Sequence, residues 1–211
     1  MARYFNYFPK TFYSTQDIVR GVDTVTNITA RFSLEQSFLD NTTIYLKYDV
    51  QESDTPEIIA SKIYDSPERH WIVLAANQII DPQWEWPLEY RTLITYITEK
   101  YSANAVSPQT GLEWAQSNIY AYYEVQTRTT ISTGASIEKK IEIDANTYAN
   151  VVASTITKTL ADGAQISIAT TKETKTYYDY EVEENENKRS IKIIKPEFAF
   201  SLEEELKRVF L

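Results

Sequence analysis

The sequence predicts an α+β protein, with a strand-helix-helix module in its first half and antiparallel β-hairpins in its second half. Three observations support this prediction. Two helix starts of the same form, Thr55-Pro56-Glu57 and Ser66-Pro67-Glu68, follow a short alternating segment. Beyond the Ser-, Asn-, Pro- and Gly-containing stretch at 102–111, the apolar period changes to two. A capping-box pattern from Ser201 to Glu204 then opens a short terminal helix.

Residues 1–43 mix aromatic side chains with Thr, Asn and Asp and show no sustained period. We therefore expect an extended N-terminal arm with short strands, which suits wrapping around a neighbouring protein. Residues 44–50 alternate well enough for a strand that leads into the module.

The two helices of the module are predicted from their starts and their apolar spacing. Thr55 can cap the first helix, Pro56 suits its first position, and Glu57 complements the positive end of the helix dipole. The second start comes soon afterwards, so the first helix has about two and a half turns. The residues expected on the buried faces are Ile58, Ile59 and Ile63 in the first helix, and Trp71, Ile72, Leu74, Ala75, Gln78 and Ile79 in the second. Asn77 is the expected left-handed terminator.

The segments after the module are predicted in turn. Leu93, Ile94, Ile97 and Tyr101 have the spacing of a third helix. Hairpin turns are expected at Thr133-Gly134 and Asp162-Gly163, and a third pair sets 178–182 against 191–193 through the charged turn 183–189. Pro196 ends the last strand, and the terminal helix then presents Leu202, Leu206, Val209 and Phe210. The predicted domains are the arm 1–43, the module and third helix 44–101, the linker 102–113, and the β-rich region with its terminal helix 114–211.

The composition indicates a folded protein. The 211 residues are 43% hydrophobic and 13% aromatic, which is too much apolar content for a disordered chain. A net charge of -9 argues against general nucleic-acid or anionic-membrane surfaces, because both need Lys and Arg clusters. The absence of Cys excludes disulfides and thiolate metal sites. The sequence shows no signal peptide and no long apolar span, so we expect a soluble, unexported chain.

Catalytic motifs are weak in this sequence. His70 is the only histidine, and we expect it to have a packing or surface role because a His-based site needs partners. The sequence has no Gly-rich phosphate loop, P-loop lysine pattern or Asp-rich calcium loop. Carboxylates from distant positions can still meet in space, but Glu57, Glu68, Glu203 and Glu204 have helix-start explanations. Glu138 and Glu142 lie on the polar side of a predicted strand. We therefore predict no catalytic residue, no cofactor and no metal.

Short pieces of the first half resemble known families. Tyr48-Asp49-Val50, Ser53-Asp54-Thr55, Ile59-Ala60, Asn77, Asp81-Pro82 and Pro87 resemble the LysM pattern Tyr-x-Val, Gly-Asp-Thr, Ile-Ala, Asn and a Pro-containing return. Ser53 replaces the usual Gly, and Trp84-Glu85-Trp86 replaces the return into a second strand. With the flanking pieces Tyr4–Pro9, Asp17–Arg20, Trp84–Leu88 and Tyr96–Tyr101, residues 1–101 resemble the LysM-like baseplate wedge proteins of contractile-tailed phages, the gene product 53 family.

This resemblance implies a structural subunit of the virion tail baseplate, made and assembled in the host cytoplasm. Several copies would lie around the baseplate ring, bind other baseplate wedge and tail proteins, and link adjacent wedges without chemistry. Nucleic acid and membrane are not expected partners. In LysM modules the two loops flanking the ligand groove correspond here to the candidate partner-binding residues Glu52, Ser53, Asp54, Thr55, Ile80, Asp81, Pro82, Trp84 and Trp86. On an extended segment Trp84 and Trp86 point to opposite sides, so one can fill the core while the other meets a partner.

Two other functions remain open at this level. The same two loops could hold peptidoglycan or chitin, as in a LysM-type carbohydrate-binding module, and a cell-wall hydrolase is a third, more distant reading. The region after Gly111 carries no family likeness, and we expect it to be an insertion or elaboration particular to a subgroup of these phages.

Overall fold

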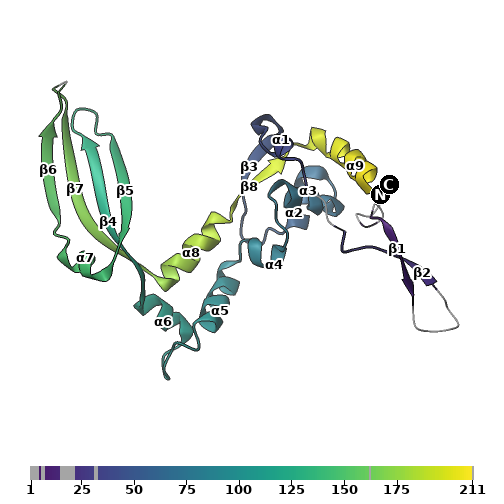
Figure 1. Ribbon diagram of the computed structural model, residues 1–211, viewed down its shortest axis with the longest axis horizontal. Helices are drawn as coiled ribbons and strands as arrows, with labels where there is room; N and C mark the ends of the chain where they lie inside the picture. Colours follow the sequence, from purple (N-terminus) through teal and green to yellow (C-terminus); the bar gives the residue numbers. More distant parts are fainter. Residues whose placement is uncertain (1–4, 6–7, 15–21, 31–32, 162, 211) are drawn as a thin grey trace. The chain divides into compact units, whose positions relative to one another are not determined.

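The computed structural model describes residues 5, 8–14, 22–30, 33–161 and 163–210 (Figure 1). The contacts divide the chain into two compact units. The first unit combines residues 1–89 with 186–211, and the second unit contains residues 90–185. The second unit is therefore inserted into the sequence of the first, and the segment 44–101, which the sequence predicts as one module, contributes to both.

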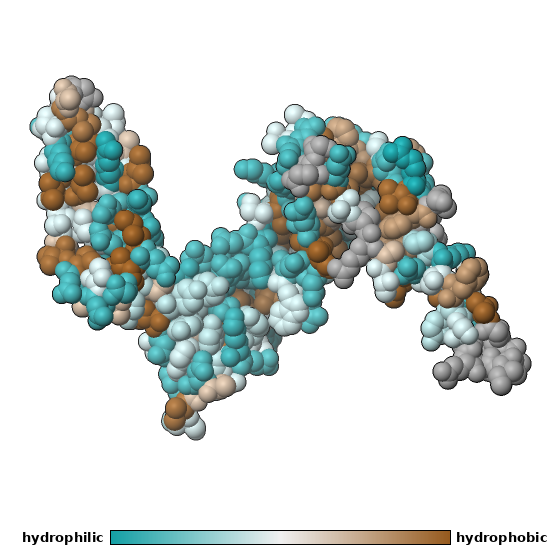
Figure 2. All heavy atoms as spheres, viewed as in Figure 1, coloured by the Kyte–Doolittle hydropathy of each residue, from teal (hydrophilic) through white to brown (hydrophobic). Residues whose placement is uncertain are grey.

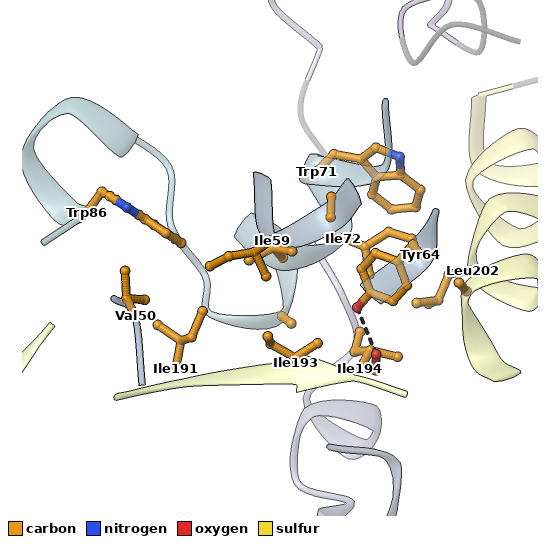
Figure 3. Packing of buried hydrophobic residues seen from close by; sticks show 14 of the residues in the cluster. Val50, Ile59, Tyr64, Trp71, Ile72, Trp86, Ile191, Ile193, Ile194 and Leu202 are labelled. Carbon is orange, nitrogen blue, oxygen red and sulfur yellow. Dashed lines mark hydrogen bonds between the residues drawn. The ribbon is translucent and has the colours of Figure 1, made fainter. Parts of the chain in front are cut away.

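The first unit is built on a two-stranded antiparallel sheet. β3 (Tyr45–Asp49) pairs with β8 (Ser190–Ile194), so the strand predicted at 44–50 finds its partner near the far end of the sequence. The helices that follow β3 are α2 (Pro56–Tyr64), the 3-10 turn η3 (Pro67–Arg69), α3 (His70–Ala76) and α4 (Pro82–Glu85). Figure 3 shows the isoleucines of β8 facing the apolar side chains of α2 and α3. Both predicted helices of the module are thus present, and their apolar faces pack toward β8.

The core of this unit is made of side chains with no exposed surface. Ile59, Ile72, Val73, Ile193 and Ile194 are each 0% exposed. The hydroxyl of Tyr64 donates to the carbonyl of Ile194 at 2.7 Å, which satisfies the polar end of a buried ring (Figure 3).

The predicted buried faces of the helices need corrections. Ile58 is 41% exposed and Gln78 is exposed, so neither belongs to the core. In α3 the buried face is centred on Ile72 and Val73, whereas the predicted Leu74 and Ala75 are half-buried. The helix begins with the 3-10 turn η3, which has fewer residues per turn, so its phase differs from that of a continuous α-helix.

The predicted caps have mixed outcomes. The hydroxyl of Thr55 accepts from the Ile58 amide at 3.3 Å, which confirms the first cap. Ser66 makes no capping hydrogen bond through its side chain, because the 3-10 turn replaces the first α-helical turn there. The prediction for Asn77 is wrong: it has φ -105°, and the left-handed residue is Gln78 with φ 57°.

Asn77 instead joins α3 to β8 through its side-chain amide. Its Nδ2 donates to the carbonyls of Val73 and Lys192, each at 2.8 Å. Its Oδ1 accepts from the Lys192 amide, also at 2.8 Å. The end of the helix is therefore fixed to the strand that closes the sheet.

The N-terminal arm contains the short strands that the sequence predicts. β1 (Lys10–Ser14) and β2 (Val22–Thr26) form an antiparallel hairpin whose strand residues are all exposed. The helical turns α1 (Gln36–Leu39) and η2 (Thr42–Ile44) follow. The family-like pieces at 4, 6–7 and 17–20 lie outside the described residues. Phe8 is buried, and its ring centroid lies 4.9 Å from that of Phe210.

The terminal helix is longer than predicted. α9 spans Pro196–Phe210, so Ser201 lies inside the helix and does not cap it. Pro196 ends the preceding strand as expected, but it also suits the first helical position, where its missing N–H is harmless. Ala199, Leu202 and Leu206 are buried, whereas the predicted Val209 is 65% exposed.

The second unit contains a four-stranded antiparallel sheet in the order β5-β4-β7-β6. Its strands are β4 (Ile119–Thr130), β5 (Ser136–Ile143), β6 (Ser154–Thr159) and β7 (Gln165–Thr176). The hairpins predicted at Thr133-Gly134 and around Gly163 are confirmed, and both glycines have positive φ; Asp162 lies outside the described residues. The short helix α7 (Ala145–Asn150), which the sequence did not predict, joins β5 to β6.

The third predicted hairpin is wrong. Residues 177–187 form the helix α8 (Tyr177–Asn187), and the segment 191–193 pairs with β3. Thr176 starts the helix, since its hydroxyl accepts from the Asp179 amide at 3.1 Å and the Asp179 carboxylate accepts from the Thr176 amide at 3.0 Å. The apparent period of two in this segment is therefore overridden by helix capping and packing.

Two further helices belong to the second unit. α5 (Tyr90–Lys100) is the predicted third helix and buries Leu93 and Ile97, and α6 is Gly111–Ser117. In α8 the carboxylate of Glu181 is buried, and its Oε1 accepts from Lys100 Nζ at 2.6 Å and from the Tyr101 hydroxyl at 2.7 Å. This buried polar cluster ties α8 to the end of α5.

Candidate partner-binding site

The first candidate loop lies between β3 and α2. Asp54 sits there with only 4% of its side chain exposed. Its carboxylate accepts from Lys62 Nζ at 2.6 Å, from the Tyr48 hydroxyl at 2.6 Å and from the Gln51 amide at 3.1 Å. Burial by itself raises the pKa of Asp54, but these hydrogen bonds, with that from Lys62 the strongest, outweigh it and hold the pKa below its usual value. The loop is therefore rigid at its centre.

The neighbouring residues of this loop are exposed. Ser53 has a positive φ of 66°, and Glu52 pairs with Arg189 Nη2 at 2.7 Å. Arg189 also donates to the Val50 carbonyl at 3.2 Å. The loop is thus held to the segment just before β8, while Glu52, Ser53 and Thr55 keep surface available for a partner.

The second candidate loop contains the short helix α4. Asp81 accepts from the Gln83 amide at 3.1 Å at the start of α4. The Glu85 carboxylate accepts from the amides of Asp81 and Ile80, at 3.0 and 2.7 Å, and these hydrogen bonds hold its pKa below the usual value. Lys188 Nζ donates to the Trp84 carbonyl at 2.8 Å. This ordered loop presents Ile80 at 65% exposure and Trp84 at 59%.

Trp86 joins the two loops. Its indole Nε1 donates to the Asp54 carbonyl at 2.9 Å, and its side chain is only 8% exposed. Figure 3 shows the ring above Val50 and Ile191, at one end of the core. The structure therefore brings the two predicted loops together through a buried hydrogen bond, and the exposed residues of both belong to one continuous folded unit.

The predicted site residues fall into two groups. Asp54 and Trp86 are buried and hold the loops in place. The exposed residues are Glu52, Ser53, Thr55, Ile80, Asp81, Pro82 and Trp84. The predicted burial difference between Trp84 and Trp86 is confirmed, but the segment is not extended: Trp84 lies in α4 and Trp86 caps its end.

A second surface feature could not be found from the sequence. An apolar groove of about 440 Å³ is lined by residues from three distant segments, among them Leu34, Phe38, Trp71, Phe198 and Leu202. Glu35 and Glu205 contribute its acidic groups. The amphipathic pattern of the terminal helix was the signal available in the sequence, but the other walls come from the arm and from α3.

The residues considered for metal binding or catalysis have local or structural contacts. The described residues contain no group of three His, Cys, Asp or Glu side chains placed to hold a metal ion. His70 Nδ1 lies 3.1 Å from the Pro67 carbonyl, a local contact at the start of its own helix. Glu203 pairs with Arg69 at 2.7 Å, so this carboxylate joins α9 to the module. Within the part of the chain that the structure describes, no helix is long and apolar enough to cross a membrane.

The chain matches a known protein family. A family model described as base plate wedge protein 53 matches residues 3–208, which is nearly the whole chain. The match includes the second unit, so the expectation that the region after Gly111 carries no family likeness is wrong. A search of curated proteins finds no match.

Proposed function

The chain belongs to the base plate wedge protein 53 family, and from this premise we propose that it binds neighbouring wedge proteins and links adjacent wedges during baseplate assembly. Membership of this family makes it a structural component of the phage tail baseplate in the virion. Several copies around the ring, assembled in the host cytoplasm, complete the proposal. No catalytic step is part of it.

We propose that the linked loops at 52–55 and 80–86 form one contact surface for a wedge protein. The observation that carries this proposal is the pair of exposed apolar side chains, Ile80 and Trp84, on a loop fixed by hydrogen bonds from both sides. An exposed tryptophan on an ordered loop is a typical binding hot spot, because little conformational entropy is lost when it is covered.

The finer fold assignment is also a proposal. β3, α2, α3 and β8 have the order strand, helix, helix and strand, and the Tyr-x-Val and Asp-Thr pieces lie at the end of β3 and the start of α2. We infer a LysM-like module whose second strand follows an inserted unit. The carbohydrate-binding alternative gains no support from the family match.

The test of the proposed function is size-exclusion chromatography with light scattering on the full chain, alone and mixed with proteins from disrupted tails of the same phage. We expect a shift into a larger complex of defined stoichiometry, and no retention on purified peptidoglycan. Retention on peptidoglycan without a protein complex would contradict the assembly role.

The contact surface is tested by Trp84→Ala in the same experiment. We expect the complex to weaken by about tenfold or more, since truncating a tryptophan hot spot costs about 2 kcal/mol. The matched control is Phe200→Ala, because Phe200 is also exposed, at 65%, and lies on α9. Equal complex formation by both variants would show that Trp84 does not lie in the contact surface.

A further inference from the structure

The two faces of the second unit's sheet differ in composition. Ile137 on β5, Arg128 on β4, Ile168 on β7 and Ile156 on β6 are direct cross-strand partners, so their side chains form a row on one face. Lys139 and Lys158 lie on the same face in the adjacent rows. We call these six side chains the isoleucine face. The opposite face carries a threonine-rich set, Thr127, Thr129, Thr155, Thr157 and Thr171, which we call the threonine face.

Much of the isoleucine face is exposed. Ile137 is 72% exposed and Ile156 is 53% exposed, at the two edges of the row. The helix α7 covers only one end, where the Tyr148 ring packs 4.8 Å from that of Tyr122. Apolar side chains appear in brown over the four-stranded sheet in Figure 2. Large aliphatic side chains aligned on a regular, ordered sheet indicate a surface that another molecule covers.

The lysine and arginine side chains on the two faces differ in their salt bridges. On the threonine-face side, Lys140 pairs with Glu173 at 2.7 Å and Lys175 pairs with Glu183 at 2.7 Å. Arg128, Lys139 and Lys158 of the isoleucine face are exposed and form no salt bridge with any described residue. The chain as a whole is strongly acidic, with net charge -9. The same face also carries Glu124, which accepts from Gln126, and Lys172. Arg128, Lys139 and Lys158 therefore lie beside the exposed isoleucines with no carboxylate partner among the described residues.

We propose that the isoleucine face binds an acidic, aliphatic surface of a neighbouring baseplate protein. This inference rests on the proposed structural role and adds the chemistry of a second contact, on the inserted unit. Carboxylates of the partner pair with Arg128, Lys139 and Lys158 at the rim, and its aliphatic side chains cover Ile137 and Ile156. Charge complementarity fixes the register, and apolar burial supplies most of the affinity.

Other occupants fit this surface less well. A symmetric dimer through the isoleucine face would set its cations against those of a second copy, and like charges across an interface are strongly unfavourable. Single-stranded nucleic acid is held by aromatic stacking platforms, whereas this row is aliphatic and the nearby Tyr122 packs against Tyr148.

The test is site-specific photocrosslinking in assembled baseplates. A benzophenone amino acid replaces Ile156 in one variant and Thr157 in the control, two neighbours on the edge strand β6 that point to opposite faces. Phage lacking its own copy is complemented with each full-length chain, baseplates are purified and irradiated, and crosslinked peptides are identified by mass spectrometry. We expect an adduct from position 156 to an acidic surface of one baseplate protein, at least about fivefold above that from position 157.

A charge-matched pair of variants gives an independent measurement. Lys139→Gln with Lys158→Gln and the control Thr155→Glu with Thr157→Glu each lower the net charge by the same amount, on opposite faces. In competition with the unaltered chain, we expect the lysine variant to enter baseplates about threefold to tenfold less, with the control close to unaltered. Unchanged thermal unfolding of both variants shows that folding is not the cause.

Several outcomes would overturn the inference. They are equal adducts from both positions, no adduct from position 156, or adducts from it to a second copy, to nucleic acid or to lipid. If the chain is present in purified baseplates and position 156 gives no adduct, this inference fails alone. If the chain is absent from baseplates, the proposed function fails with it.

Discussion

The isoleucines in the core of the first unit and those at the edges of the second unit's sheet are buried to very different extents. In the first unit, Ile59, Ile72 and Ile193 have no exposed surface, because α3 packs on β8, α2 packs on α3, and their apolar side chains form one core. In the second unit, Ile137 and Ile156 lie mostly exposed on a sheet that no described helix covers along its length. The first unit is therefore stabilised by its own core, whereas the second unit's sheet depends on strand pairing and keeps apolar surface for a partner.

The largest effect should come from shortening a core isoleucine. Ile72→Ala leaves a cavity where neighbours cannot collapse, and we expect a loss of about 2–5 kcal/mol in the free energy of unfolding. Ile137→Ala on the exposed sheet should change it by less than about 0.5 kcal/mol. Urea unfolding of both variants checks this, and comparable losses would show that the sheet has a core of its own.

Trp86 offers a second comparison, between a buried and an exposed tryptophan. Trp86→Phe removes the indole N–H that donates to the Asp54 carbonyl, so we expect a loss of about 1–3 kcal/mol from a buried acceptor without its donor. Trp84→Phe should cost less than about 0.5 kcal/mol in stability. Equal denaturation midpoints for Trp86→Phe and Trp84→Phe would show that the hydrogen bond from Trp86 to the Asp54 carbonyl does not stabilise the fold.

The stability of the second unit should be more sensitive to a substitution at the contact between α6 and α5 than to one at an open turn. Gly111 packs so closely on α5 that an added Cβ would clash with the Thr98 carbonyl oxygen, so Gly111→Ala should cost about 1–3 kcal/mol. Gly134→Ala meets open space but keeps a positive φ of 69°, and we expect a cost of about 1 kcal/mol. Trp114 lies in this unit, and the other tryptophans lie outside it. When those are replaced by Phe, the fluorescence of Trp114 measures unfolding of the second unit.

The smallest effect concerns acid stability of the first unit. The pKa of Asp54 is below its usual value of 3.8 in the folded chain, so its contribution is complete above that value and is lost as pH falls through the lower, folded pKa. Asp54→Asn should therefore be less stable at neutral pH by about 1–2 kcal/mol and show a flatter decline in acid. Thermal unfolding from about pH 2 to 6 measures this. Parallel declines for both proteins would contradict it.

The features that the sequence predicted correctly are local ones. The start of α2 follows from Thr55-Pro56, because a cap and an N1 proline act within one turn. The turn at Gly134 follows from a residue that tolerates positive φ. The helix α8 was missed because the alternation of Tyr178, Tyr180 and Val182 favoured a strand. The cap of Thr176 with Asp179 was a local signal, but the contacts of Glu181 with Lys100 and Tyr101 join residues distant in sequence.

The candidate site shows the same limit. The sequence indicated both loops and the different burial of Trp84 and Trp86. It could not indicate that the indole of Trp86 binds the Asp54 carbonyl, or that Arg189 holds Glu52, because these contacts join residues 32 and 137 positions apart in the sequence. The alternation of residues 44–50 indicates a strand, but it does not indicate which distant segment pairs with that strand.

The late position of β8 has a consequence for synthesis of the protein. β3, α2 and α3 leave the ribosome first, then the whole second unit, and only then the strand that carries Ile191, Ile193 and Ile194. The inner faces of α2 and α3 therefore stay without β8 until the whole second unit has been translated, while that unit can fold in the meantime. A chain translated only as far as residue 187 lacks Lys188 and Arg189, which hold the two candidate loops, so the contact surface is complete only after the second unit has been made.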